Sequence, residues 1–220
     1  MKLEGIVINS IDYKETSKIV NLYTNNGKIS VIAKGALNPK KGFLGFITTG
    51  NIVSFVCTDS NAKSLMEYSL IHNSFNINDN IELIKAFGVI IDIIKEIPDD
   101  INHEKCYEFI KNVLLNLGKV NTKRLMSVFL IKLLYVFGIA PNLKTCVRCN
   151  SNIIVSISIS SGGALCDKCS TPDIEYLNIW KEYYYDKKDF NLYSDTNYDK
   201  LIKDIRDYYS YHLGINLRLN

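Results

Sequence analysis

Four cysteines are the residues in this sequence whose types and spacing point most clearly to chemistry. Cys146 and Cys149 form one pair with two residues between them, and Cys166 and Cys169 form a second pair of the same kind. Two intervening residues let both thiolates of a tight turn point at one ion, and two such turns complete a tetrahedron. The spacing therefore predicts one bound Zn²⁺. Because four protein ligands leave no open coordination position, we expect a structural ion rather than a catalytic one.

Cysteine pairs have two other common uses, as disulfides in a secreted protein and as redox-active sites. The disulfide alternative conflicts with residues 1–5, which include charged residues and a glycine and lack an apolar signal segment. The redox alternative predicts a single pair, not two pairs of matched spacing. The remaining cysteines, Cys57 and Cys106, fall in a predicted strand and a predicted helix, where each is expected to be a buried small apolar side chain.

The common motifs that organise a catalytic reaction are missing from this sequence. Residues 35–42 contain lysines but lack the spacing of a nucleotide-binding phosphate loop, and no hydrolase, zinc-protease or dinucleotide-binding motif occurs. His72, His103 and His212 are isolated from one another in sequence. Asp99 and Asp100 are compatible with a metal-dependent nuclease, which is a minor alternative. The sequence predicts a protein that is not an enzyme.

Positive charge is concentrated in two blocks, although the net charge is only +3. Residues 1–50 and residues 105–148 each contain many more basic than acidic side chains, whereas residues 81–104 and 171–220 are acidic by comparison. Two basic blocks predict a positive surface assembled by the fold, which is typical of a nucleic-acid partner. The other interpretation is ordinary solvated faces in a chain rich in lysine throughout.

The predicted secondary structure changes from strands to helices near residue 78. Short β-branched and aromatic segments over 3–9, 18–24, 28–34, 51–57 and 64–71 predict five strands. Asn25-Asn26-Gly27 predicts a tight hairpin between the second and third. Five short strands in so few residues favour a small closed or nearly closed barrel. The third and fourth strands are joined by residues 35–50, and a connection of that length indicates function or mobility.

Helical periodicity follows, over residues 81–97, 102–117, 122–137, 175–185 and 199–213. Asn102 and Asn121 are expected to cap the second and third helices. The tyrosine-rich segments around Trp180 and Tyr208 are expected to be core or a groove for a partner peptide, rather than platforms for base stacking. No apolar run is long enough to span a bilayer, so we expect a cytosolic protein without a membrane partner.

The order of several short motifs resembles that of the bacterial recombination mediator family RecO. The matching segments are residues 5–8, 15–20, 22–28 and 33–36 near the amino terminus, residues 137–141 before the cysteine pairs, Gly162-Gly163 before Cys166, and Tyr208-Tyr209 with residues 212–214 in the last helix. The resemblance covers essentially the whole chain.

The resemblance implies an α+β fold with an OB-fold DNA-binding barrel over residues 1–77. A helical domain over residues 78–220 would follow, with a four-cysteine zinc knuckle inserted at residues 144–171. It also implies a role in recombinational DNA repair, in the cytoplasm and at the nucleoid. Such proteins bind single- and double-stranded DNA and anneal complementary strands. They act with RecR, and often RecF, to load RecA onto strands coated by single-strand binding protein.

Five basic residues are the predicted DNA contacts. Lys34 follows from the family pattern. The family continues with further basic residues directly after Lys34-Gly35-Ala36, whereas this chain has Leu37 and Asn38 there. Lys40 and Lys41 come slightly later in the same loop and are expected to substitute for them. Lys123 and Arg124 at the start of the third helix are expected to add phosphate contacts. The alternative function is a protein-interaction adaptor, in which the acidic, aromatic carboxy-terminal helices bind a partner and DNA contact is incidental.

Overall fold

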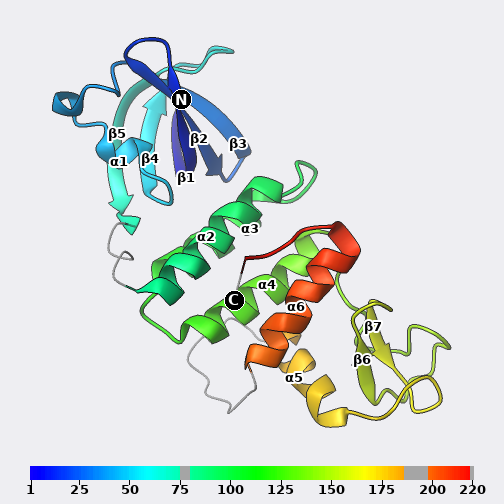
Figure 1. Ribbon diagram of the computed structural model, residues 1–220. Helices are drawn as coiled ribbons and strands as arrows, with labels where there is room; N and C mark the ends of the chain where they lie inside the picture. Colours follow the sequence, from blue (N-terminus) through cyan, green and yellow to red (C-terminus); the bar gives the residue numbers. More distant parts are fainter. Residues whose placement is uncertain (75–79, 186–197, 219–220) are drawn as a thin grey trace. The chain divides into compact units, whose positions relative to one another are not determined.

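The computed structural model describes residues 1–74, 80–185 and 198–218, and the chain divides into two compact units. The amino-terminal unit is Met1–Leu117 and the carboxy-terminal unit is Gly118–Asn220. The first contains β1 (Lys2–Tyr13), β2 (Ser17–Thr24), β3 (Gly27–Ala33), the 3-10 turn η1 (Pro39–Lys41), α1 (Leu44–Ile47), β4 (Ile52–Cys57), β5 (Leu65–His72), α2 (Ile81–Glu96) and α3 (His103–Asn116) (Figure 1). The second contains α4 (Thr122–Val136), β6 (Ser156–Ser158), β7 (Gly163–Leu165), α5 (Ile174–Tyr185) and α6 (Tyr198–Leu213).

The five strands of the amino-terminal unit form one curled antiparallel sheet in the order β3-β2-β1-β4-β5. The long β1 pairs with β4 through its first half and with β2 along most of its length, and a bulge between Val7 and Asn9 shifts the register with β2. The backbone N–H of Ile32 donates to the carbonyl of Lys63 at 2.8 Å, which joins β3 to the start of β5 in parallel. This closure confirms the predicted barrel and gives it the strand connectivity of an OB fold.

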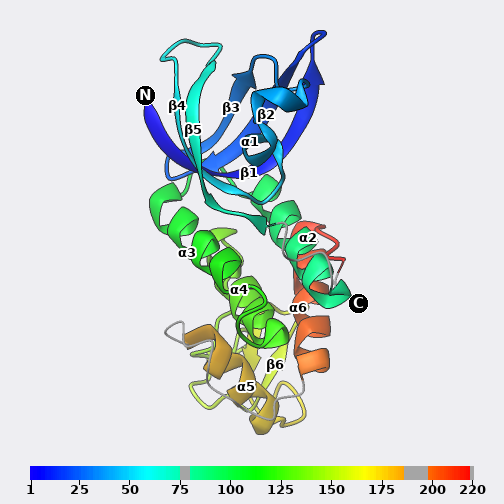
Figure 2. The same cartoon turned by 90° about the vertical axis from the view of Figure 1, so that its left-hand side faces the viewer.

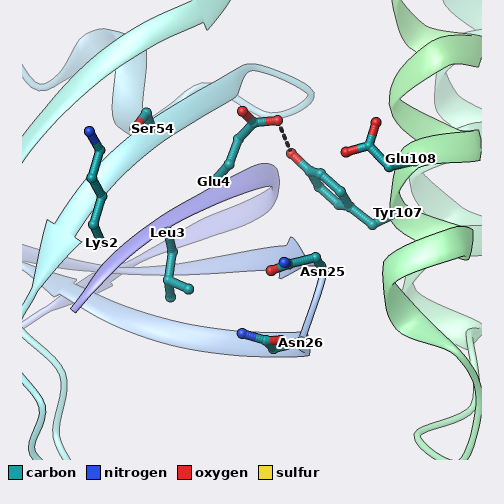
Figure 3. Close-up of a pocket in the computed structure, with 8 residues that line it drawn as sticks. All are labelled: Lys2, Leu3, Glu4, Asn25, Asn26, Ser54, Tyr107 and Glu108. Carbon is teal, nitrogen blue, oxygen red and sulfur yellow. Dashed lines mark hydrogen bonds between the residues drawn. The ribbon is translucent and has the colours of Figure 1, made fainter.

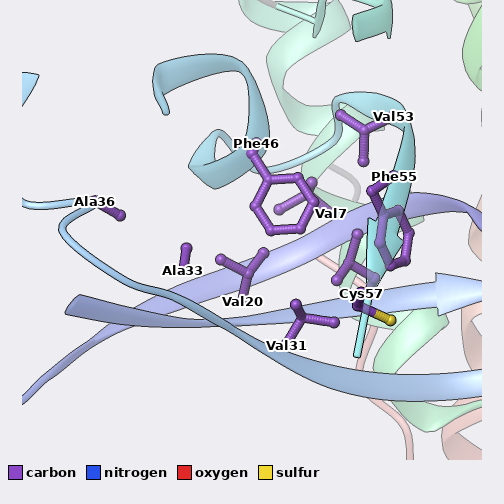
Figure 4. Close-up of a cluster of buried hydrophobic side chains, with 10 residues drawn as sticks. Val7, Val20, Val31, Ala33, Ala36, Phe46, Val53, Phe55 and Cys57 are labelled. Carbon is purple, nitrogen blue, oxygen red and sulfur yellow. The ribbon is translucent and has the colours of Figure 1, made fainter. Parts of the chain in front are cut away.

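Apolar side chains of the strands fill the barrel, and one helix closes it. Alternate residues of β1, β2, β3 and β4 point inward, and Figure 4 shows Val7, Val20, Val31, Val53 and Phe55 among them. The ring of Phe46 enters this cluster from α1, with its centroid 5.6 Å from that of Phe55 and 5.4 Å from that of Tyr68. The connection between β3 and β4 is therefore anchored in the barrel core.

Helix α3 is joined to the strands by polar contacts. The hydroxyl of Tyr107 donates to Glu4 Oε1 at 2.8 Å, and Lys111 forms an ion pair with the same carboxylate at 2.5 Å. The ring nitrogen Nδ1 of His103 lies 3.2 Å from the Tyr23 hydroxyl. Because of these contacts the division between compact units falls after Leu117, whereas the change from strands to helices lies near residue 78 as predicted.

The helices begin and end where the sequence predicts within one or two residues. The side chains of Asn102 and Asn121 accept backbone N–H bonds and cap α3 and α4. The first turn of α2 is not part of the core: Ile81 and Ile84 are exposed, and the buried residues of this helix begin at Ala86.

Helix α4 is the centre of the carboxy-terminal unit and packs against both α5 and α6. Figure 2 shows α5 and α6 beside it, with β6 next to α5. The buried aromatic residues include Trp180, Tyr183, Tyr208 and Tyr209, and the Tyr209 hydroxyl donates to the Leu130 carbonyl at 2.9 Å. These aromatics are core, as predicted, and are not available for base stacking. Among the helices described, none is long and apolar enough to cross a membrane.

Substitution of Phe46 by alanine tests its role as the anchor. We expect Phe46→Ala to lower the free energy of unfolding by about 3–5 kcal/mol, because it removes a ring that is fully buried. Chemical denaturation followed by circular dichroism measures the change. Met66→Ala on β5, where the side chain is exposed, is the matched control and should be nearly neutral. Equal effects of the two substitutions would contradict the anchoring role.

Candidate metal centre and nucleic-acid interface

The four predicted cysteines come together at one point of the carboxy-terminal unit. All four sulfur atoms lie within 4.8 Å of one another. The Sγ atom of Cys149 is 3.4 Å from that of Cys166 and 3.8 Å from that of Cys169. A tetrahedron of thiolates around a zinc-sized ion has sulfur–sulfur distances of about 3.8 Å, from bonds of about 2.3 Å. The cluster therefore has the donor atoms and the dimensions to hold one metal ion.

Two tight turns of the backbone bring each pair of sulfurs to the same side. In the first, the N–H of Asn150 donates to the Cys146 carbonyl at 2.9 Å, and Asn150 adopts a positive φ of 59°. Asparagine tolerates this left-handed conformation better than most residues. In the second turn, the N–H groups of Cys169 and Ser170 both donate to the Cys166 carbonyl, at 3.0 and 3.1 Å.

The sulfurs have unequal proton affinities because they share protons and backbone donors. Desolvation opposes ionisation of the Cys146 thiol, but backbone N–H groups from both turns outweigh it and lower its pKa to about 6. A hydrogen bond to the Cys166 sulfur, together with desolvation, raises the pKa of Cys169 to about 12. Four thiolates this close repel one another, so full ionisation of the cluster requires a bound cation.

The metal-site segment is attached to two helices of its own unit. Leu143 and Ala164 form an apolar cluster with Leu177 of α5. His212 of α6 places Nε2 2.8 Å from the carbonyl of Ile159, in the turn between β6 and β7. The cysteine spacing gave no sign of these attachments, because they depend on residues far apart in the chain.

The roles of two further residues of the segment, Gly163 and Arg148, become clear only in the structure. A Cβ atom on Gly163 would lie 2.5 Å from the backbone oxygen of Asn142, so no side chain fits there. The guanidinium of Arg148 donates to the Cys169 carbonyl at 3.2 Å and lies 3.4 Å from the Ser161 hydroxyl, which joins the two halves of the segment next to the sulfurs.

The second candidate site is the basic loop, defined as residues 34–50. It carries Lys34, Lys40 and Lys41 and no acidic residue. Lys34, Lys40 and Lys41 are all exposed, and none of the three forms an ion pair with the residues that the structure describes. Gly35 has a positive φ of 78°, and a Cβ atom there would lie only 2.6 Å from Lys41 Nζ, so the Lys41 side chain lies directly over this turn. The three cations are thus collected on one short stretch of surface.

The basic loop is held to the barrel along its length. Asn38 accepts the N–H of Lys40 with its side chain at 3.0 Å and begins η1. Four hydrogen bonds tie the loop to the strands or the residues beside them: Leu37 N–H to the Thr16 carbonyl at 3.1 Å, the Tyr68 hydroxyl to the Gly42 carbonyl at 2.6 Å, Asn51 Nδ2 to the Gly45 carbonyl at 2.9 Å, and the Ser10 hydroxyl to the Ile47 carbonyl at 3.0 Å. Together with Phe46, these bonds give the loop one backbone conformation.

The second predicted group of DNA contacts needs correction. Arg124 is 1% exposed, and its guanidinium faces Glu182 at 3.4 Å and the ring of Tyr183 at 4.9 Å. A side chain buried in this way supports the packing of α4 against α5 and does not reach a phosphate. Lys123 is half exposed and forms an ion pair with Asp199 at 2.7 Å, so it is a weaker candidate than the loop lysines.

Other cations of the second basic block also make contacts within the protein. Lys111 pairs with Glu4, Lys132 donates to the Tyr184 carbonyl, and Arg148 donates to the Cys169 carbonyl. The sequence showed the charges of this block but not their partners, because the partners lie far away in the chain. Glu4, the partner of Lys111, is 107 residues away. Charge counting alone therefore overestimates the cationic surface here.

A polar pocket of about 480 Å³ also opens on the amino-terminal unit. Figure 3 shows its lining, which is Lys2, Leu3, Glu4, Asn25, Asn26, Ser54, Tyr107 and Glu108. Burial and the neighbouring Glu4 carboxylate raise the pKa of the Tyr107 hydroxyl, so it remains a hydrogen-bond donor. Two carboxylates in the lining make this pocket unsuitable for a phosphate backbone.

Comparison with known proteins matches nearly the whole chain. A family model described as "Recombination protein O N terminal" matches residues 1–73, and one described as "Recombination protein O C terminal" matches residues 81–220. The chain belongs to the RecO family. Three similar curated proteins, each named DNA repair protein RecO, come from Bacillus mycoides (30% identical), Bacillus cereus strain AH187 (28%) and Bacillus anthracis strain CDC 684 (28%). Each match covers 78% of this chain and 71% of the relative.

Family membership agrees with the geometry described above. The amino-terminal RecO domain is an OB fold, which is the connectivity of the five-stranded barrel. The carboxy-terminal match includes the helices and the cysteine cluster. The family resemblance expected from the sequence motifs is confirmed.

Substitution of one exposed cysteine tests the metal site. We expect the wild-type chain to retain one metal ion and Cys149→Ser to retain almost none, because a tetrahedral site loses a ligand. The thermal unfolding temperature should fall with the metal. Elemental analysis after gel filtration, with parallel calorimetry, measures both. Cys106→Ser is the matched control, because Cys106 is buried outside the cluster. Full metal content in Cys149→Ser would exclude this four-cysteine site.

Proposed function

We propose that this chain is a recombination mediator in DNA repair that binds single- and double-stranded DNA through its basic loop. Lys34, Lys40 and Lys41 would contact the phosphate backbone. The observation that carries the proposal is the loop itself: three lysines without acidic neighbours in residues 34–50, on an OB-fold barrel of a RecO family member. Backbone charge dominates such binding, so we expect little preference for base sequence.

The mediator role extends this DNA binding to partners. The relatives are named DNA repair proteins, and we infer that this chain likewise anneals complementary strands and acts with RecR on strands coated by single-strand binding protein, so that RecA is loaded. RecF is a further partner of the same reaction. Such a protein works in the cytoplasm at the nucleoid. Binding and positioning suffice for this role, so no catalytic residue is assigned.

The four-cysteine cluster would hold zinc in this proposal. Four sulfur donors within 4.8 Å of one another favour Zn²⁺, and they would fill its four coordination positions. The ion supplies stability: Cys146, Cys149, Cys166 and Cys169 would hold the segment after Leu143 in one conformation. This role needs no reaction at the metal.

Removal of the loop charges tests DNA binding. We expect Lys34→Ala, Lys40→Ala and Lys41→Ala together to weaken binding of a single-stranded oligonucleotide at low salt by at least about tenfold. The slope of log K against log salt should become shallower by about 2, since each lost phosphate contact removes about 0.7. Fluorescence anisotropy at several salt concentrations measures both. Strand annealing, with and without single-strand binding protein, should fall in parallel.

A second triple variant controls for loss of charge in general. Lys85→Ala, Lys119→Ala and Lys168→Ala together remove three exposed lysines that lie outside the basic loop. This variant should keep most of the affinity. If the two triple variants lost equal affinity, the loop assignment would be wrong. A wild-type chain that binds no DNA even at low salt would instead favour the protein-interaction adaptor.

A further inference from the structure

An apolar groove of about 260 Å³ runs beside the lysines of the basic loop. Its lining includes Leu37, Pro39, Phe43, Leu44 and Ile47, together with the stem of Lys18 from β2. The Lys18 ammonium is paired with Asp12 at 2.5 Å, so the charge of this side chain is already balanced. The aliphatic part of Lys18 forms one wall of the groove. The floor and walls of the groove are therefore almost entirely hydrocarbon and aromatic.

The groove is exposed where a folded domain would normally bury such residues. Leu44 is 70% exposed and Leu37 is 37% exposed, on the two sides of η1. Leu44 is the first residue of α1, the helix that inserts Phe46 into the barrel. The same helix thus buries one apolar side chain and presents another to solvent. Exposed apolar residues that lie together in a hollow indicate a binding site.

The walls of the groove are fixed before any ligand arrives. The N–H of Leu37 is bound to the Thr16 carbonyl, and the carbonyl of Ile47 is bound to the Ser10 hydroxyl, so both ends of the groove are tied to the barrel. Phe46 anchors the stretch between them. A preformed groove avoids the entropy cost of ordering a loop on binding.

Charge around the groove selects its occupant. Pro39 and Asn38 line the groove, and the next two residues are Lys40 and Lys41 of η1. The Lys41 side chain lies over Gly35, directly before Ala36 of the groove lining. A ligand seated here has an apolar surface in the groove and negative charge at its rim. One nucleotide of a single strand has both, as a flat base and its flanking phosphates.

We propose that the apolar groove takes one unpaired base of single-stranded DNA while the loop lysines hold the adjoining phosphates. In a duplex the bases are stacked and paired, so the groove would add affinity for single strands only. Its volume suits one ring system and is short for an amphipathic helix, which needs anchors over two turns. This inference rests on the proposed DNA binding and adds a reason for discrimination between single and double strands.

Oligonucleotides with and without bases test the groove. The probes are a thymidine oligonucleotide, the same strand with abasic positions, and a duplex, each titrated into the intact chain by anisotropy. We expect Leu44→Ser with Leu37→Ser to bind the thymidine strand about tenfold more weakly, since stacking of one base contributes about that factor. Binding of the abasic strand and the duplex should be unchanged, and so should the salt slope.

The control is Met66→Ser, which changes a side chain of β5 that is equally exposed but lies outside the groove. It should leave all three affinities unchanged. The groove inference is overturned if the double variant changes none of the affinities, or lowers all three alike. It is also overturned if the double variant loses binding of an acidic, hydrophobic peptide while single-strand affinity stays the same.

The same titrations separate this inference from the proposed function. If the wild-type chain binds DNA with the expected salt dependence but binds the abasic and thymidine strands equally, only the groove inference fails. If the wild-type chain binds none of the three probes, both the proposed DNA binding and the groove inference fail.

Discussion

Phe46 enters the barrel core from the connection between β3 and β4, and its position determines where the basic loop can go. Its ring packs on Phe55 and Tyr68, inside a barrel closed by the bond between Ile32 and Lys63. Apolar burial holds the loop at this point, and hydrogen bonds to the strands hold it on either side. The lysines and the apolar groove are therefore presented by a fixed backbone. Preorganisation of this kind lowers the entropy cost of binding a flexible strand.

The four-cysteine cluster lies in the carboxy-terminal unit, in a segment with little apolar core of its own. The segment around it has only a few buried apolar residues, among them Leu165 and two of the cysteines themselves, which is too small a core to fold alone. A metal ion bound by the four cysteines would supply the missing stability. Contacts to Leu177 and His212 then join the segment to α5 and α6. Loss of the metal is expected to loosen this unit first, and any effect on DNA binding would be indirect.

The sequence predicted the features that depend on local pattern. Strand alternation, the Asn-Gly hairpin, the asparagine caps and the cysteine spacing each follow from neighbouring residues, and the structure confirms the barrel, the helices and the clustering of the four cysteines. The features it missed depend on distant partners. Arg124 stands at a helix start like a phosphate contact, but Glu182 and Tyr183 enclose it. The groove was missed for the same reason, because Lys18 meets the loop only after β2 and β3 have paired.

Hydrogen exchange of backbone amides, with and without a thymidine oligonucleotide, tests the central claim most directly, because it locates the contact without any substitution. Binding through the basic loop predicts slower exchange at residues 34–48 and no change at the start of α4 or in the cysteine segment. Slower exchange at residues 122–126 or 144–171, with the loop unchanged, would contradict the assignment of DNA binding to the barrel.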